Sequence, residues 1–201
     1  MPDPLRFPAP PAGGPVRRGP LGPLADDLKA LVPGLRAAEM LFPGILLLRG
    51  AAGNAAFRDA VAGVLVAVLG AEPGRVQVGA GCTLLCVAQG EWLVVLPSGR
   101  EEVALRTLAA ALEACEGAVL DVSDAHAVLD LSGPLVREVL AKGCPTDLHP
   151  RALPPGRCAL TRLAGVGVVI LALDGGALRL FVPASFARWV AAWLLDAAAE
   201  Y

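Results

Sequence analysis

The sequence predicts an α+β fold made of two similar units, each ordered as strand, helix, antiparallel strands and helix. Two observations lead to this prediction: apolar residues switch between helical and strand periods from Leu24 onward, and the element order of the first half recurs in the second. The recurrence includes W-L-V-V-L-P at 92–97 and L-R-L-F-V-P at 178–183, each followed within two residues by a serine and then by a helical pattern. We expect mixed or antiparallel sheets, with repeat halves at about residues 44–116 and 117–199 that pack as one body.

The elements of the first half are bounded by caps and turns. Asn54 is a suitable N-cap for a helix that Gly70 would end, and Gln89-Gly90 is suited to a tight hairpin. The predicted elements are a helix at 24–31, a strand at 45–49, a helix at 55–69, strands at 83–88 and 91–96, and a helix at 101–113. The inward stripe of the helix at 55–69 is predicted to hold Phe57, Val61, Val64, Leu65 and Val68.

The second half is predicted in the same way. A turn at Ser132-Gly133-Pro134 opens a helix that stops at Gly143, and Pro145 prevents it from resuming. The predicted elements are strands at 119–122 and 127–131, a helix at 135–142, a hairpin of 158–163 with 166–173, a strand at 178–182 and a helix at 183–199. The last helix is predicted to turn Phe186, Val190, Trp193 and Leu194 inward.

Composition limits the classes of protein and partner. The chain of 201 residues has a formal net charge of −2, which disfavours nucleic acid or an anionic membrane as the main partner. No apolar run reaches the roughly 18 residues of a membrane helix, and no basic-then-apolar leader is visible, so we expect a cytoplasmic protein. Residues 1–23, rich in proline and glycine, are expected to form a flexible arm, and residues 24–201 a single domain.

The surface is expected to be unusually apolar. Hydrophobic residues make up 55% of the chain and charged residues 18%. Much of this excess is alanine, but a surface with large apolar areas is usually covered by a partner. Composition therefore favours a protein that works in an assembly.

The sequence disfavours three kinds of active chemistry. A structural zinc site is disfavoured, because Cys144, His149 and Cys158 lack its ligand spacing and its fourth ligand. A nucleophile reading of Cys144 with His149 and Asp147 has no support beyond their proximity in sequence. No G-x-G-x-x-G turn suits a dinucleotide. We therefore predict no catalytic, cofactor-binding or metal-binding residue in this chain. The carboxylates of Asp121, Asp124 and Asp130 are expected to cap turns or face solvent.

The segment at 119–161 carries a resemblance to a known family. Its motifs are D-x-S-D at 121–124, L-S-G-P at 131–134, K-G-C-P-x-D-L-H-P at 142–150 and P-G-x-C-A at 155–159. This run resembles the gamma subunit of heterotetrameric sarcosine oxidase, a family similar in turn to the folate-binding region of the aminomethyltransferases of glycine cleavage. The resemblance implies an aminomethyltransferase-like fold and partnership with alpha, beta and delta subunits.

The resemblance also implies a function for the assembly. In that family FAD, FMN, NAD and tetrahydrofolate belong to the partner subunits, and the complex demethylates sarcosine oxidatively to glycine, a one-carbon unit and hydrogen peroxide. This chain would then be an inactive scaffold. Its candidate contact residues, chosen because Trp and Arg are enriched at binding hot spots, are Trp92, Arg151, Arg157, Arg188, Trp189 and Trp193. For the tryptophans, a position in the core is the alternative. For the function there are two alternatives: a free-standing folate-binding module, or the equivalent subunit of another N-methyl amino acid dehydrogenase.

Overall fold

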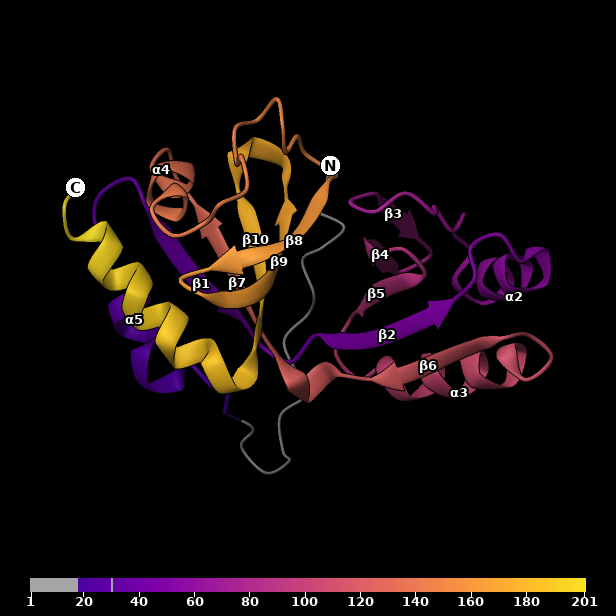
Figure 1. Ribbon diagram of the computed structural model, residues 1–201. Coiled ribbons are helices and arrows are strands. Elements are labelled where there is room, and N and C mark those ends of the chain that lie inside the picture. Colours follow the sequence, from indigo (N-terminus) through magenta and orange to yellow (C-terminus); the bar gives the residue numbers. More distant parts are fainter. Residues whose placement is uncertain (1–17, 30) are drawn as a thin grey trace. The chain divides into compact units, whose positions relative to one another are not determined.

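The computed structural model describes residues 18–29 and 31–201, so most of the predicted arm, residues 1–17, lies outside the described part (Figure 1). The described chain divides into two compact units, which we call the first unit (residues 42–123) and the second unit (residues 18–41 with 124–201). Each unit has a five-stranded sheet in which all paired strands run antiparallel. The predicted α+β class and antiparallel pairing are confirmed.

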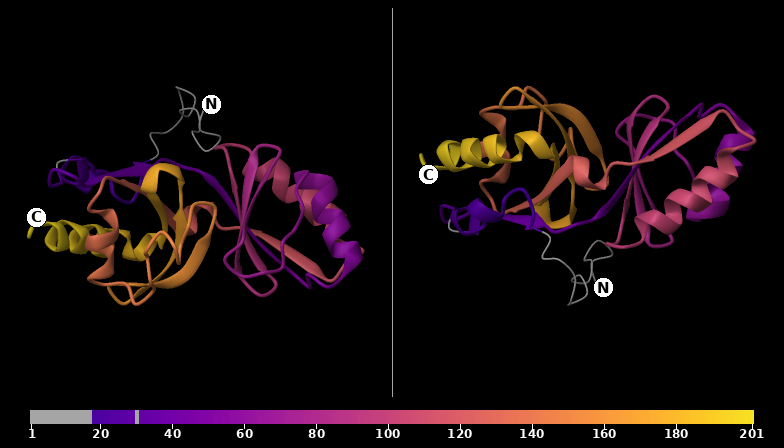
Figure 2. Two further views of the ribbon diagram at one scale, coloured as in Figure 1. Left: turned by 90° about the horizontal axis from the view of Figure 1, so that it is seen from above. Right: turned by 90° about the horizontal axis from the view of Figure 1, so that it is seen from below.

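The first unit covers one face of its sheet with two helices. Its elements are β2 (Gly44–Gly50), α2 (Ala55–Leu65), β3 (Val76–Gly79), β4 (Cys82–Ala88), β5 (Glu91–Leu96), α3 (Glu101–Leu112) and β6 (Gly117–Asp121). The strand order is β3-β4-β5-β2-β6. Figure 2 shows α2 and α3 on the same side of this sheet. Buried side chains such as Phe57, Leu84 and Leu108 form the core between helices and sheet.

The second unit has the corresponding arrangement. Its elements are α1 (Ala25–Lys29), β1 (Arg36–Met40), β7 (His126–Ser132), α4 (Val136–Ala141), β8 (Cys158–Leu163), β9 (Val166–Ala172), β10 (Leu178–Pro183) and α5 (Ala187–Ala198). The strand order is β1-β7-β10-β9-β8. The three helices α1, α4 and α5 pack with the strands in a single core, to which they contribute Leu28, Val139 and Leu194. Leu21, placed in the predicted arm, is also fully buried in this core.

The two units share one order of elements. In the first unit β2-α2-β3-β4-β5-α3 occupies the positions that β7-α4-β8-β9-β10-α5 occupies in the second. The remaining edge strand comes from different places in the chain: β6 follows α3, whereas β1 precedes the whole first unit and pairs with β7. Among the described residues, no helix has the length and apolar character needed to cross a membrane.

The end of α2 differs from the sequence prediction. The helix stops at Leu65 because Val66 takes a left-handed conformation (φ 49°, ψ 46°), four residues before the expected stop at Gly70. Beyond this point the chain is no longer helical, so Val68, predicted to face inward, is 83% exposed. The left-handed region is unfavourable for a β-branched residue, so Val66 is a strained helix end.

We expect Val66→Gly to stabilise the protein. Glycine adopts φ 49° without the Cβ clash, and Val66 is 68% exposed, so little packing is lost. A gain of about 1 kcal/mol in the free energy of unfolding is the expected size. Urea denaturation compared with wild type measures it. The control is Val68→Gly, because Val68 is also largely exposed (83%) but lacks the left-handed backbone. A lower stability for Val66→Gly would contradict the strain at this helix end.

Candidate interaction surface

Aromatic side chains lie on the surface of the second unit at the start of α5. Phe186, just before the helix, is 51% exposed, and Trp189 is 59% exposed. Trp193 is partly buried against the core. Trp189 and Trp193, four residues apart within α5, lie on the same side of the helix, and Phe186 directly precedes its first residue. We call Phe186, Trp189 and Trp193 the α5 aromatic flank.

Two contacts fix the orientation of the tryptophans. The Trp189 Nε1–H donates to the carbonyl of Ala164, in the turn between β8 and β9, at 3.3 Å. The Trp193 ring lies against Gly143, where an added Cβ would be 2.5 Å from Cζ2 of the indole. Gly143, which follows α4, therefore leaves the space that the ring fills. An aromatic side chain that is exposed yet held in place loses little conformational entropy on binding a partner.

The predicted arginines are only partly brought together. Arg188 is exposed on α5, and its Nε donates to the carbonyl of Pro20 at 3.4 Å. Arg151 is exposed and Arg157 partly exposed, both in the connection between α4 and β8. The structure thus places Arg188, Trp189 and Trp193 on one helix and the other two arginines on a separate segment.

Trp92 belongs to the core of the first unit. Its side chain on β5 is fully buried, its Nε1–H donates to the carbonyl of Gly70 at 2.8 Å, and its ring centroid is 5.8 Å from that of Phe57. A contact residue must reach its partner. The interface role expected for Trp92 is incompatible with this burial, and the core alternative describes it correctly.

Phe186 was missed because the helical phase is broken before α5. Pro183 is followed by a short 3₁₀ turn, Ala184–Phe186, and the α-helix begins only at Ala187. A stripe counted continuously from Pro183 places Phe186 inward, whereas the change of helix type turns it outward. Val190 and Leu194, counted within the α-helix, are buried as predicted.

The residues considered for metal or nucleophile chemistry have structural contacts. Cys144 is buried with Sγ 3.8 Å from Thr161 Oγ1, and His149 Nδ1 accepts a hydrogen bond from the Arg151 backbone N–H at 3.2 Å. In the part of the chain that the structure describes, no group of three or more His, Cys, Asp and Glu is placed to hold a metal ion. Burial raises the pKa of the Cys82 and Cys86 thiols, which keeps both protonated at neutral pH.

The carboxylates divide into two roles. Asp121 accepts from the Ser123 backbone N–H at 2.9 Å and from its hydroxyl at 2.5 Å, which is the expected turn cap. Asp130, on β7, instead forms a two-point ion pair with Arg179 on β10, at 2.6 and 2.9 Å. Arg179 is only 2% exposed. Asp130 therefore serves an ion pair rather than a turn, and its side chain remains 38% exposed to solvent.

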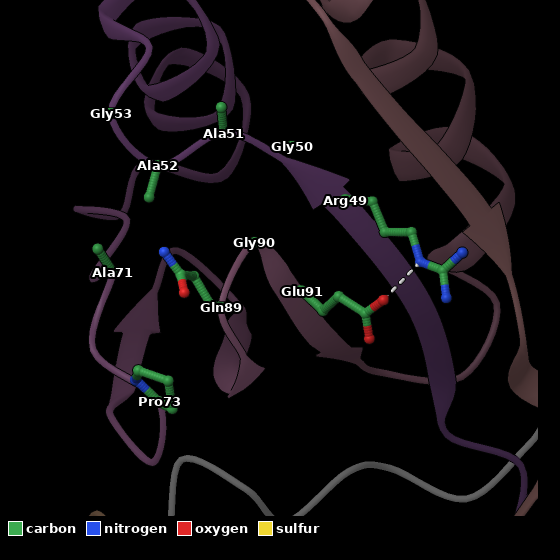
Figure 3. Close-up of a pocket in the computed structure, with 10 residues that line it drawn as sticks. All are labelled: Arg49, Gly50, Ala51, Ala52, Gly53, Ala71, Pro73, Gln89, Gly90 and Glu91. Carbon is green, nitrogen blue, oxygen red and sulfur yellow. Dashed lines mark ion pairs between the residues drawn. The ribbon is translucent and has the colours of Figure 1, made fainter.

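A hollow in the first unit lies beside the start of α2 (Figure 3). Its lining residues are mostly small: Arg49, Gly50, Ala51, Ala52, Gly53, Ala71, Pro73, Gln89, Gly90 and Glu91. Gln89 directs its amide toward Ala52 and Ala71, while Arg49 and Glu91 pair with each other at 3.0 Å. Both charged side chains are substantially exposed. Water screens such a pair, so the lining of the hollow holds no buried charge.

Comparisons with known proteins agree on one family. Residues 49–200 match the sequence profile of the "Sarcosine oxidase, gamma subunit family". The sarcosine oxidase subunit gamma of Corynebacterium sp. (strain P-1) is 35% identical over 191 residues, covering 92% of each chain. A chain of the heterotetrameric sarcosine oxidase from Corynebacterium sp. U-96, solved with pyrrole 2-carboxylate, superposes with a TM-score of 0.84 at 33% identity, over 92% of this chain and 95% of that one.

The fold also resembles a second kind of protein. Aminomethyltransferase T of the glycine cleavage system from Bartonella henselae superposes with a TM-score of 0.61 at 16% identity. The match covers 88% of this chain and 49% of that one. At this identity the likeness concerns the fold alone, and it agrees with the aminomethyltransferase-like fold that the sequence motifs implied.

Proposed function

The chain belongs to the sarcosine oxidase gamma subunit family, and we propose that it is the non-catalytic gamma subunit of a heterotetrameric sarcosine oxidase, with the α5 aromatic flank as a contact surface for a companion subunit. The carrying observation is the exposure of Phe186 and Trp189, two large aromatic side chains at the start of α5. Arg188 adds a cation beside them. Aromatic residues and arginine are the types enriched at protein interfaces.

In this proposal the chemistry belongs to the alpha, beta and delta subunits. They would carry FAD, FMN, NAD and tetrahydrofolate and convert sarcosine to glycine, a one-carbon unit and hydrogen peroxide. This chain would bind none of these groups and would fix the geometry of the subunits that do. Three features are consistent with a structural role: the hollow is lined mostly by small residues, Asp121 caps a turn, and the buried Cys82 thiol stays protonated.

Trp189→Ala is expected to weaken the assembly strongly. The substitution removes an exposed but oriented indole, so the isolated chain should keep its stability while its affinity for the companion subunits falls roughly 30-fold, as for a hot-spot residue. The four subunits are co-expressed with a tag on this chain, and the co-purified subunits and the visible flavin absorbance are quantified.

Leu160→Ala is the matched control. Leu160 lies on β8 and is 58% exposed, close to the exposure of Trp189. It should leave co-purification unchanged. A tagged wild-type chain that emerges alone and colourless would reject the gamma-subunit role, and an undiminished yield with Trp189→Ala would reject the flank as its contact surface.

Two alternatives are separated by the same preparation. A free-standing folate-binding module would be recovered alone and would bind a reduced folate in titration. The equivalent subunit of another N-methyl amino acid dehydrogenase would be recovered with flavin-bearing subunits that turn over a different N-methyl amino acid. In the folate-binding alternative a carboxylate such as Asp121 or Asp124 would contact the pterin. Ser123 already occupies Oδ1 of Asp121, which counts against Asp121 in that role.

A further inference from the structure

The first unit has a groove between its two helices, with both apolar and polar residues in its lining. The groove, of ≈ 400 Å³, is lined by Val64, Leu65, Ala80, Gly81, Cys82, Leu96, Pro97, Arg100, Val103, Ala104 and Thr107. Leu65, Cys82 and Leu96 are buried, whereas Val103 on α3 is 55% exposed at its edge. The groove therefore joins a buried apolar floor to an exposed rim of mixed polarity, which also carries Arg100 and Thr107.

An unpaired cation lies in this lining. Within the described residues the Arg100 guanidinium makes no ion pair, although two acidic residues follow it directly. Glu102 pairs with Arg106 at 3.2 Å. Glu101 lies instead against Gly44, where an added Cβ would be 2.9 Å from its Oε2. The positive charge of Arg100 is therefore available to a carboxylate from outside, at the N-terminal end of α3, where the helix dipole also favours a negative group.

The strained end of α2 adjoins the same groove. Val66 follows the lining residue Leu65, is 68% exposed and takes the left-handed conformation that glycine would adopt more easily. Backbone strain of this kind is concentrated at functional positions, where the side chain serves a purpose that glycine cannot. An apolar contact made by Val66 with a partner is such a purpose.

We propose that this groove receives a segment of a companion subunit of the oxidase, one that presents an apolar side chain next to a carboxylate. The apolar side chain enters between α2 and α3, and the carboxylate pairs with Arg100. This inference rests on the proposed function, because it requires the assembly. It adds a second contact surface, carried by the first unit, to the aromatic flank carried by the second, so that the gamma chain acts as a bridge with one recognition surface on each unit.

Photo-crosslinking in the complete complex tests the groove. Val103→p-benzoylphenylalanine is compared with Trp189→p-benzoylphenylalanine, each co-expressed with the other subunits, and the captured chain is identified by mass spectrometry. We expect the Val103 probe to capture a companion subunit through a segment that contains Asp or Glu beside an apolar residue. Capture by the Trp189 probe alone would overturn the groove proposal and leave the proposed function standing. Capture by neither probe would overturn both contact surfaces, whereas the gamma-subunit role would still be decided by co-purification. A crosslink between two copies of this chain at Val103 would also overturn the groove proposal.

Substitutions give a second, independent readout. Arg100→Glu and Val103→Asp should each reduce co-purification roughly tenfold, whereas Val78→Asp, at a 64% exposed valine of β3 outside the groove lining, should not. Val66→Gly should also reduce co-purification while stabilising the isolated chain, so that misfolding cannot explain its effect. Undiminished co-purification with all three groove variants would overturn the proposal.

Discussion

Gly133→Ala is expected to destabilise the second unit by at least about 4 kcal/mol. Gly133 has φ +116°, which an L residue rarely adopts, and an added Cβ would lie 2.1 Å from the carbonyl oxygen of Gly34. That oxygen cannot move away easily, because it belongs to the backbone and accepts from the Leu135 N–H at 3.1 Å. The glycine of the L-S-G-P motif is therefore a close-approach position between the ends of β7 and β1. Urea denaturation followed by circular dichroism measures the loss.

Gly156→Ala separates the cost of the positive φ from the cost of the steric clash with the Gly34 carbonyl oxygen. Gly156 also has a positive φ (+76°), but no atom lies within 4 Å of its added Cβ. It should cost only about 1 kcal/mol, as expected for backbone strain alone. Equal losses for the two alanine variants would show that the approach to Gly34 is not a steric constraint.

The elements that sequence alone predicted best are those with local signals. The hairpins at Gln89-Gly90 and Ala164-Gly165 join β4 to β5 and β8 to β9 as expected, because turn chemistry and flanking strands lie within a few residues. β1 was not predicted. Its R-A-A-E-M segment has no strand-like alternation of strong hydrophobes, and it is a strand because it pairs with β7, far along the chain, with Ala37 opposite Leu131.

The candidate surface shows the same division between local and nonlocal information. The tryptophans were candidate contact residues because of their residue type, which does not distinguish a core residue from an exposed one. For Trp92 a signal was present, since it opens the continuous apolar run W-L-V-V-L that is typical of a fully buried strand. For Arg100 none was visible, because its lack of an ion pair depends on where Glu101 and Glu102 turn their side chains.

Asp130→Ala is expected to destabilise the second unit by about 3 kcal/mol, because it leaves the buried Arg179 cation without its carboxylate. The pair joins β7 to β10 at directly opposed positions, with Nε to Oδ1 at 2.6 Å and Nη2 to Oδ2 at 2.9 Å. Arg179 Nη1 already lacks a hydrogen-bond partner in the described structure. The Asp130 side chain is 38% exposed, so water offsets part of the loss, and the value falls at the lower end for broken buried pairs.

The double variant Asp130→Leu with Arg179→Met gives the decisive comparison. It removes both charges and fills the space with apolar side chains, so its stability should be within about 1 kcal/mol of wild type. If Asp130→Ala were as mild as the double variant, the buried guanidinium would not need its partner. If the stabilities follow the expected order, the pair matters through the penalty on an unpaired charge. Such a penalty disfavours any shift of β10 along β7, because a slip of one residue would separate Arg179 from Asp130.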